Sequence, residues 1–237
     1  MKKIGLVGGI SWSSTLDYYR YINEETNKHL GGLNFSECII YSVNFEHFNK
    51  CNAAHDWEGT FQLLSKAAQH LKYAGADVIL LGANTAHIVA ERISEATRLP
   101  LIDIRTATAG AIRKQNIKKI GLLGTEFTME LDFYKNKLSE YEIESIIPQN
   151  KSDRNFIEET LLYELGKGII KKETKNEYIR IANTLIQQGA QGIVLGCTEI
   201  PLLLNQEDFS VPVFNTTKIH AEAAVEFALS KTQPILL

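Results

Sequence analysis

Short apolar runs alternate with longer amphipathic stretches along the whole chain. The short runs are rich in Ile, Val and Leu and end at glycine or polar residues, which is typical of buried strands. The longer stretches place apolar residues at helical spacing. The expected strands are Ile4–Val7, Cys38–Val43, Val78–Leu81, Leu101–Ile104, Ile120–Leu123, Glu142–Ile147, Ile193–Leu195 and Val213–Phe214. The expected helices are Ser13–Asn27, Trp57–Tyr73, Ala86–Thr97, Phe127–Tyr141, Asn155–Leu165, Lys175–Gln188 and His220–Leu229. This alternation predicts an α/β fold with parallel sheets flanked by helices.

The same pattern of segments occurs twice along the chain. Residues 2–9 match residues 118–125 at an offset of 116, and residues 75–83 match residues 189–197 at an offset of 114. Residues 99–103 match residues 211–215 at an offset of 112. These three matching pairs of segments, here called anchors, occur in the same order and at nearly constant offsets, which indicates a duplication. We therefore expect two similar lobes, each a parallel sheet flanked by helices, related by duplication.

The last predicted helix follows the third anchor of the second repeat and has no counterpart position left in that repeat. We expect it to pack on the first lobe. Lobe one is then discontinuous and comprises residues 1–104 and 216–237, and lobe two comprises residues 105–215.

Composition and charge exclude several functional classes. Twenty-five basic and 28 acidic residues give a net charge of −3, so a general nucleic-acid binder or a membrane-surface binder is not expected. No apolar run reaches the roughly 18 residues of a transmembrane helix, and residues 1–9 resemble a strand more than a signal peptide. The three cysteines form no C-x-x-C motif, which favours a reduced, cytoplasmic protein.

Polar residues follow the predicted strands, where ligands of open α/β sheets bind. The first strand runs into Gly8-Gly9-Ile10-Ser11, a turn that lets backbone approach a ligand and in which Ser11 can cap the next helix. Its counterpart in the second repeat is Gly124-Thr125. The spacing of the glycines matches neither the dinucleotide-binding fingerprint nor a Walker motif. An anion site and a plain turn with a serine cap both remain open.

The turns Gly82-Ala83-Asn84-Thr85 and Gly196-Cys197-Thr198-Glu199 form the stronger pair. Both are expected to open a helix, where a cysteine has a stabilised thiolate and raised reactivity. Cys197 is therefore the candidate reactive residue. His87 could serve as an acid or base, or it could cap or pack. No histidine, cysteine or carboxylate cluster has metal-ligand spacing, so no metal site is expected.

The segments 4–12, 84–87 and 196–199 together resemble the aspartate/glutamate racemase family. The resemblance extends over nearly the whole chain and implies racemisation of a small amino-acid substrate without pyridoxal phosphate, metal or other cofactor. It also implies two α/β lobes related by a pseudo-twofold axis, and a homodimer. In that family two thiols lie on opposite faces of the substrate α-carbon, and one removes the α-proton while the other delivers a proton. Cys197 matches the second of these positions.

Ala83 stands where the resemblance implies the first acid/base group, usually cysteine and in some members threonine. Alanine can neither accept nor donate a proton. One explanation is a replacement introduced to trap substrate, which we favour because residues 84–87 otherwise match the family. The other is that the natural protein has abandoned two-base chemistry, as in the single-cysteine branch similar to arylmalonate decarboxylase.

The resemblance assigns further residues to substrate binding. The residues expected to bind the substrate α-carboxylate are Asn84, Thr85 and Thr198. The remainder of the binding site is expected to be lined by Thr125, Ser11 and Ile10. Lys167 matches a family lysine that contacts a side-chain carboxylate, although a solvated loop lysine is equally compatible. Aspartate-specific members carry an arginine on a first-lobe loop, but no arginine occurs between Arg20 and Arg92. Asn52 is the expected contact there.

Three functions therefore remain open from the sequence. The first is racemisation of aspartate, glutamate or a wider set of amino acids, impaired in this chain by Ala83. The second is a single-cysteine decarboxylase or isomerase on the same scaffold. The third is a small-molecule sensor that has lost catalysis.

Overall fold

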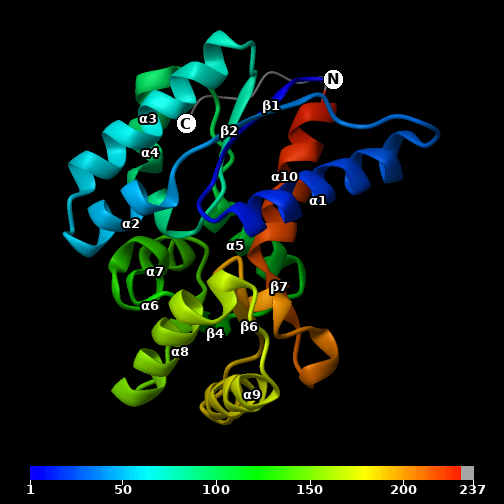
Figure 1. Ribbon diagram of the computed structural model, residues 1–237. Coiled ribbons are helices and arrows are strands. Elements are labelled where there is room, and N and C mark those ends of the chain that lie inside the picture. Colours follow the sequence, from blue (N-terminus) through cyan, green and yellow to red (C-terminus); the bar gives the residue numbers. More distant parts are fainter. Residues whose placement is uncertain (231–237) are drawn as a thin grey trace. The chain divides into compact units, whose positions relative to one another are not determined.

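The computed structural model describes residues 1–230, which form two compact units (Figure 1). Unit 1 comprises Met1–Ile104 and the segment from His220 onward, and unit 2 comprises Arg105–Ile219. The sequence placed the return to the first lobe at residue 216, whereas the structure places it at His220. Each unit is a parallel sheet flanked by helices, which confirms the expected α/β class.

Unit 1 contains a three-stranded parallel sheet of order β2-β1-β3. Its strands are β1 (Ile4–Gly8), β2 (Cys38–Ser42) and β3 (Val78–Leu81). Its helices are α1 (Trp12–Leu30), α2 (Phe45–Ala53), α3 (Trp57–Tyr73), η1 (Thr85–Val89), a 3₁₀ helix, α4 (Ala90–Thr97) and most of α10 (Thr216–Leu229).

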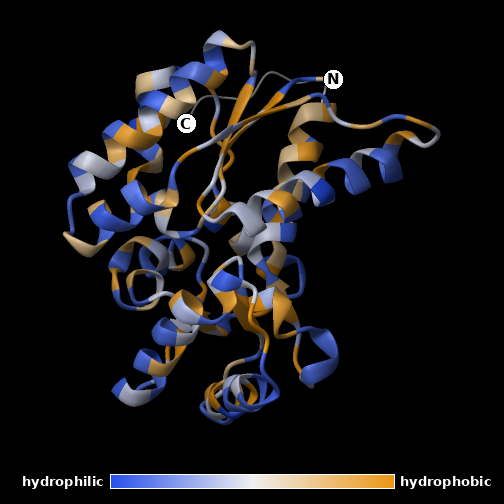
Figure 2. Ribbon diagram, viewed as in Figure 1, coloured by the Kyte–Doolittle hydropathy of each residue, from blue (hydrophilic) through white to orange (hydrophobic). Residues whose placement is uncertain are grey.

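Alternate side chains of the central strands enter two cores, one on each face of the unit 1 sheet. Val7 and Leu81 pack with Leu64 and Leu71 of α3 and with Ile93 of α4. Their sequence neighbours Leu6 and Leu80 lie in a second core with residues of α1 and α10. Because both faces are covered, the strands are apolar throughout, as the hydropathy colouring of Figure 2 shows.

Unit 2 contains a four-stranded parallel sheet of order β5-β4-β6-β7. Its strands are β4 (Lys119–Gly124), β5 (Glu144–Ile146), β6 (Ile193–Gly196) and β7 (Val213–Asn215). Its helices are α5 (Ile104–Lys114), α6 (Glu126–Glu130), α7 (Asp132–Ser139), α8 (Lys151–Tyr163), α9 (Lys172–Gln187) and the 3₁₀ helices η2 (Leu165–Lys167), η3 (Ile200–Leu202) and η4 (Gln206–Asp208). Buried residues of α8 and α9 cover one face, and those of α5 and α7 cover the other.

The two sheets have the same strand register. Gly5 pairs with Ile79 in unit 1, and Gly121 pairs with Ile193 in unit 2. These four residues are equivalent by the offsets of 116 and 114 found in the sequence. The Ile79 amide donates to Pro100 O at 2.9 Å, and the Ile193 amide donates to Pro212 O at the same distance. The repeated sequence anchors therefore occupy matching positions in the two sheets.

Several elements differ between the expectation and the structure. The expected strand at 101–104 is wrong apart from one bridge between Leu101 and Ile79, because the chain turns into α5 at Ile104. The expected helix 127–141 is two helices, α6 and α7, broken at Leu131, whose backbone is extended. The helices α2 and α5 were not expected. The amide of Glu46 donates to Asn44, which caps α2, and this sequence is too polar to show a clear helical periodicity.

A buried histidine ties α10 to the remainder of unit 1. His220 Nε2 lies 2.6 Å from the Ile102 carbonyl, which can only accept, so Nε2 carries the ring proton. Tyr18 OH then donates to His220 Nδ1 at 2.7 Å. Burial, followed by the nearby His87 ring, lowers the pKa of His220 to about 3. The neutral ring is therefore part of the fold.

We predict that acid destabilises unit 1 through His220. The pKa of His220 is about 3 in the folded chain and 6.5 in the unfolded chain. Between these two pH values the unfolded chain binds a proton that the folded chain does not. The contribution of neutral His220 to the free energy of unfolding is fully present above pH 6.5. It is lost as pH falls, and the loss reaches about 2 kcal/mol at pH 5. Urea unfolding of the wild type and of His220→Gln, at pH 7 and pH 5, measures it.

The variant should be less stable at pH 7 but should lose less stability on acidification. His47 is exposed and serves as the control, because His47→Gln should retain the wild-type pH dependence. Equal acid destabilisation of the wild type and His220→Gln would show that His220 does not carry the effect.

Candidate functional site

The turn that follows β6 brings a thiol, a hydroxyl and a carboxylate together. Cys197 Sγ donates to Glu199 Oε2 at 2.9 Å, and Thr198 Oγ1 donates to the same oxygen at 2.9 Å. Thr198 and Glu199 are buried, whereas Cys197 is partly exposed. One carboxylate therefore orients both predicted functional side chains of this turn. Sequence reasoning assigned no role to Glu199, although it stands two residues after Cys197.

The expected stabilisation of a Cys197 thiolate by a helix N-terminus is wrong for this structure. The helix after the turn is η3, a 3₁₀ helix of three residues that begins at Ile200. Burial and then the Glu199 carboxylate raise the pKa of the Cys197 thiol well above its ordinary value. The resting form of Cys197 is a thiol that can donate a proton, and Glu199 is the adjacent group that can hold that proton when the sulfur acts as a base.

The end of β4 lies beside this turn in unit 2. Gly124 pairs with Gly196, the last residues of β4 and β6. A Cβ at Gly196 would lie 2.9 Å from the Leu123 carbonyl, so glycine is required for this close approach. Thr125 follows immediately, and its hydroxyl lies 3.2 Å from the hydroxyl of Thr128. The structure thus brings Thr125 to the strand end adjacent to Cys197.

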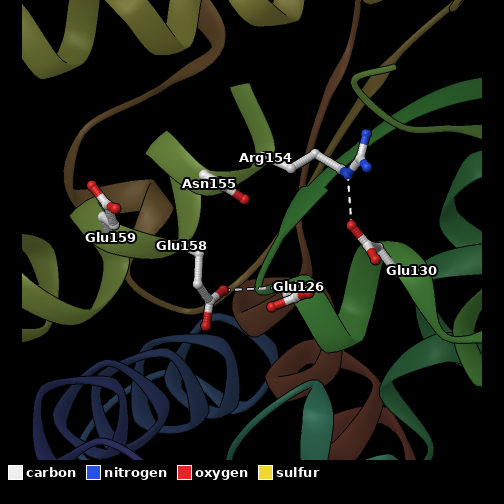
Figure 3. Close-up of a pocket in the computed structure, with 6 residues that line it drawn as sticks. All are labelled: Glu126, Glu130, Arg154, Asn155, Glu158 and Glu159. Carbon is white, nitrogen blue, oxygen red and sulfur yellow. Dashed lines mark hydrogen bonds and ion pairs between the residues drawn. The ribbon is translucent and has the colours of Figure 1, made fainter. Parts of the chain in front are cut away.

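Glu158 of α8 reaches the same strand end. Its Oε2 accepts from the backbone amide of Glu126 at 2.7 Å, which places the carboxylate one residue after Thr125 (Figure 3). Burial raises the pKa of Glu158. The hydrogen bond from the Glu126 amide lowers this pKa and the Glu126 carboxylate raises it, and the net shift is upward. Glu158 was not expected from the sequence. It stands in the middle of a helix, with no local motif to show that it faces a strand end.

A cavity of about 200 Å³ lies beside Glu158, between α6 and α8. Its walls are four carboxylates, one guanidinium and one amide, from Glu126, Glu130, Glu158, Glu159, Arg154 and Asn155. Figure 3 shows Arg154 directed at Glu130, and the Nε to Oε1 distance is 2.6 Å.

The equivalent turn of unit 1 follows β3 and carries Ala83, Asn84 and Thr85. All three are buried, and η1 begins at Thr85. The Ile104 amide donates to His87 Nε2 at 3.2 Å, so the proton of the neutral ring lies on Nδ1, which donates to the Ala83 carbonyl at 2.9 Å. Both ring nitrogens are thereby used within the fold. Of the two roles left open for His87, the structure supports packing.

The turn after β1 contributes Ile10 and Ser11, both of which are buried. Gly9 precedes them with a φ of 82°, and its amide donates to Thr15 Oγ1 at 2.8 Å. Ser11 is the N-cap residue of α1, as expected, but its side chain makes no capping hydrogen bond. Its hydroxyl instead lies 2.9 Å from that of Ser13.

Two expected binding residues lie in different surroundings from those the sequence suggested. Asn52 lies on α2 rather than in a loop, is buried, and accepts from Thr60 Oγ1 at 3.3 Å. Lys167 ends η2, and its Nζ lies 5.5 Å from the centre of the Tyr163 ring.

Residues 1–230 contain no group of three or more His, Cys, Asp or Glu that could hold a metal ion. None of the helices in this part of the chain is both long and apolar enough to cross a membrane. All three cysteines are free, and Cys51 lies on helix α2.

Comparisons with known proteins place these residues in a family. A family model described as Asp/Glu/Hydantoin racemase matches residues 7–224. A solved structure of a candidate Asp/Glu racemase from Yersinia pestis is 48% identical, with a TM-score of 0.90 over 97% of this chain and 100% of that chain. An aspartate racemase homologue from Pyrococcus horikoshii is 36% identical, with a TM-score of 0.85 over 97% and 100% of the two chains.

A broad specificity amino-acid racemase, RacX of Bacillus subtilis, is 24% identical over 96% of this chain and 98% of its own length. Arylmalonate decarboxylase shares the fold, at 14% identity and a TM-score of 0.51. The match to the family model spans most of both units, from β1 to α10. The chain belongs to the Asp/Glu/hydantoin racemase family.

Proposed function

We propose that this protein transfers protons at the α-carbon of a free amino acid, without a cofactor, and that Cys197 is its acid/base residue. Family membership supports amino-acid racemisation. The observation that carries the assignment to Cys197 is its hydrogen bond to Glu199 at the end of β6. A thiol paired with a buried carboxylate has an adjacent group that can take its proton and return it.

The proposed reaction begins with proton removal. Glu199 takes the thiol proton, and Cys197 Sγ removes the α-proton, whose bonding electrons pass into the substrate carboxylate to give an enediolate. Hydrogen-bond donors stabilise the charge that develops on the enediolate oxygens. Thr125 and Thr198 of unit 2, with Asn84, Thr85 and Ser11 of unit 1, are the proposed donors, and Ile10 packs beside them.

Inversion requires a proton donor on the opposite face of the α-carbon. Position 83 is equivalent to Cys197 by the internal repeat, and Ala83 has no proton to give. We propose that this chain exchanges the α-proton on one face and racemises slowly. Return of the proton by Cys197 to the face from which it came restores the starting enantiomer.

The proposal includes three further features, of which the first two follow from the family resemblance and the third from the cysteine content. The protein acts without pyridoxal phosphate, forms a homodimer, and works in the cytoplasm. Lys167 and Asn52 are proposed to contact the substrate side chain, and the substrate is aspartate, glutamate or a wider set of amino acids. Gel filtration with light scattering tests the dimer.

We predict that Cys197 is alkylated by a substrate-sized α-halo acid in preference to Cys38 and Cys51. The rate should rise with pH beyond the range of an ordinary thiol, because burial and Glu199 hold the pKa of Cys197 high. Glu199→Gln removes the negative charge, so it should lower this pKa and speed alkylation at pH 7.5. Peptide mapping by mass spectrometry at several pH values measures both effects.

Glu173 is exposed in the same unit, and Glu173→Gln should leave the alkylation rate unchanged. Preferential labelling of Cys38 or Cys51, or slower labelling of Cys197 in Glu199→Gln, would contradict the assignment.

We predict that Ala83→Cys raises racemisation by about 10²–10⁴-fold, the usual contribution of one positioned acid or base. Loss of optical rotation from a single enantiomer in D₂O, recorded together with deuterium incorporation, measures it. The wild type should incorporate deuterium with little loss of rotation. Ala83→Ser is the matched control, because a serine hydroxyl has nearly the size of a thiol but is too weak an acid to replace it.

The same measurements separate the alternatives. A sensor would bind amino acids without deuterium incorporation in either form. A single-cysteine decarboxylase would release carbon dioxide from substituted malonates, and Ala83→Cys would not create racemisation.

A further inference from the structure

Glu158 is a half-buried carboxylate without a cation. Within residues 1–230 it forms no ion pair, and the Glu126 amide is the one hydrogen-bond donor that its carboxylate meets. Burial raises the pKa of Glu158, and the carboxylate of Glu126 adds to this rise. A carboxylate taken partly out of water needs a positive partner to offset the loss of hydration.

Arg154 cannot supply that partner. Its Nε donates to Glu130, and its NH1 donates to the carbonyls of Pro148 and Gln149, each at 2.8 Å. The guanidinium is therefore held away from Glu158, as Figure 3 shows. The cavity walls carry four carboxylates and one paired guanidinium, and their field repels a second carboxylate from a ligand.

The cavity lies next to the proposed reaction site in unit 2, because Glu126, which lines the cavity, directly follows Thr125. Glu158 is bonded to the residue after Thr125, and Gly124 and Gly196 pair directly before Thr125 and Cys197. A substrate held at Cys197 and Thr125 thus has Glu158 within reach of its side chain. The cavity volume of about 200 Å³ is below the roughly 300–1,000 Å³ of pockets for whole ligands, so it suits one arm of a substrate.

The geometry points to a substrate side chain that carries a terminal cation, such as the ammonium of lysine or ornithine, with Glu158 as the residue that selects it. This inference rests on the proposed function, narrows its substrate class, and assigns the side-chain contact to Glu158 in place of Lys167. The methylene groups of such a side chain occupy the cavity, and the ammonium donates to the free oxygen of Glu158. An acidic side chain in the same place would face Glu158 and Glu126 and would be repelled.

The test compares side chains that differ by one charge. Lysine and norleucine have the same chain length, and norleucine lacks the ammonium group. Calorimetry on the full-length protein should show that lysine binds about ten- to one-hundredfold more tightly than norleucine, the usual contribution of a charged hydrogen bond. Aspartate and glutamate should bind more weakly than either. Deuterium incorporation at the α-carbon of each amino acid is measured in parallel.

Glu158→Gln keeps the size and the amide contact but removes the charge. It should abolish the preference for lysine over norleucine and leave norleucine affinity unchanged, while Glu173→Gln should retain the preference. If glutamate binds as tightly as lysine, if norleucine matches lysine, or if Glu158→Gln keeps the preference, Glu158 does not select a cation. Exchange of aspartate or glutamate α-protons would then leave the proposed function standing, whereas the absence of binding and exchange for every amino acid would overturn both.

Discussion

The parallel pairing of β4 with β6, in a register that ends with Gly124 opposite Gly196, determines where Thr125 and Cys197 of unit 2 lie. The pairing holds the two strand ends so close that a Cβ on either glycine would meet backbone at about 3 Å. Thr125 and Cys197 must therefore emerge side by side. The β1–β3 pair of unit 1 has the same register, so Ala83 leaves its strand in the same way. The residue type at these strand ends can change, while the direction in which its side chain leaves the sheet stays the same.

A single buried carboxylate adds chemical control to this geometry. Glu199 accepts from both Cys197 and Thr198, so a loss of either donor leaves the other contact in place. Burial and this carboxylate together raise the pKa of the Cys197 thiol and keep the sulfur protonated. A free thiolate would be open to oxidation and to stray electrophiles. A thiol that ionises only when a substrate is bound avoids both.

The sequence predicted the strands well because buried parallel strands are nearly uniform in hydropathy, and Val78–Leu81 has the predicted bounds. It located the turns of Ala83 and Cys197 because they follow such strands. It did not predict the tight 3₁₀ turns, in which the polarity of Asn84, Thr85 and Thr198 imitates an ordinary helix start. It could not reveal Glu158, because the contact between α8 and the end of β4 depends on tertiary packing across 32 residues.

His87 holds the carbonyl oxygen of Ala83 and the amide of Ile104, and neither contact involves a side chain at position 83. The backbone there is fixed by its neighbours, whatever residue it carries. A reactive group could accordingly be gained or lost at this position over evolutionary time by a change in one codon, while His87 holds the backbone in place. A position with a fixed backbone therefore allows one scaffold to gain, lose or alter proton transfer without a change of fold.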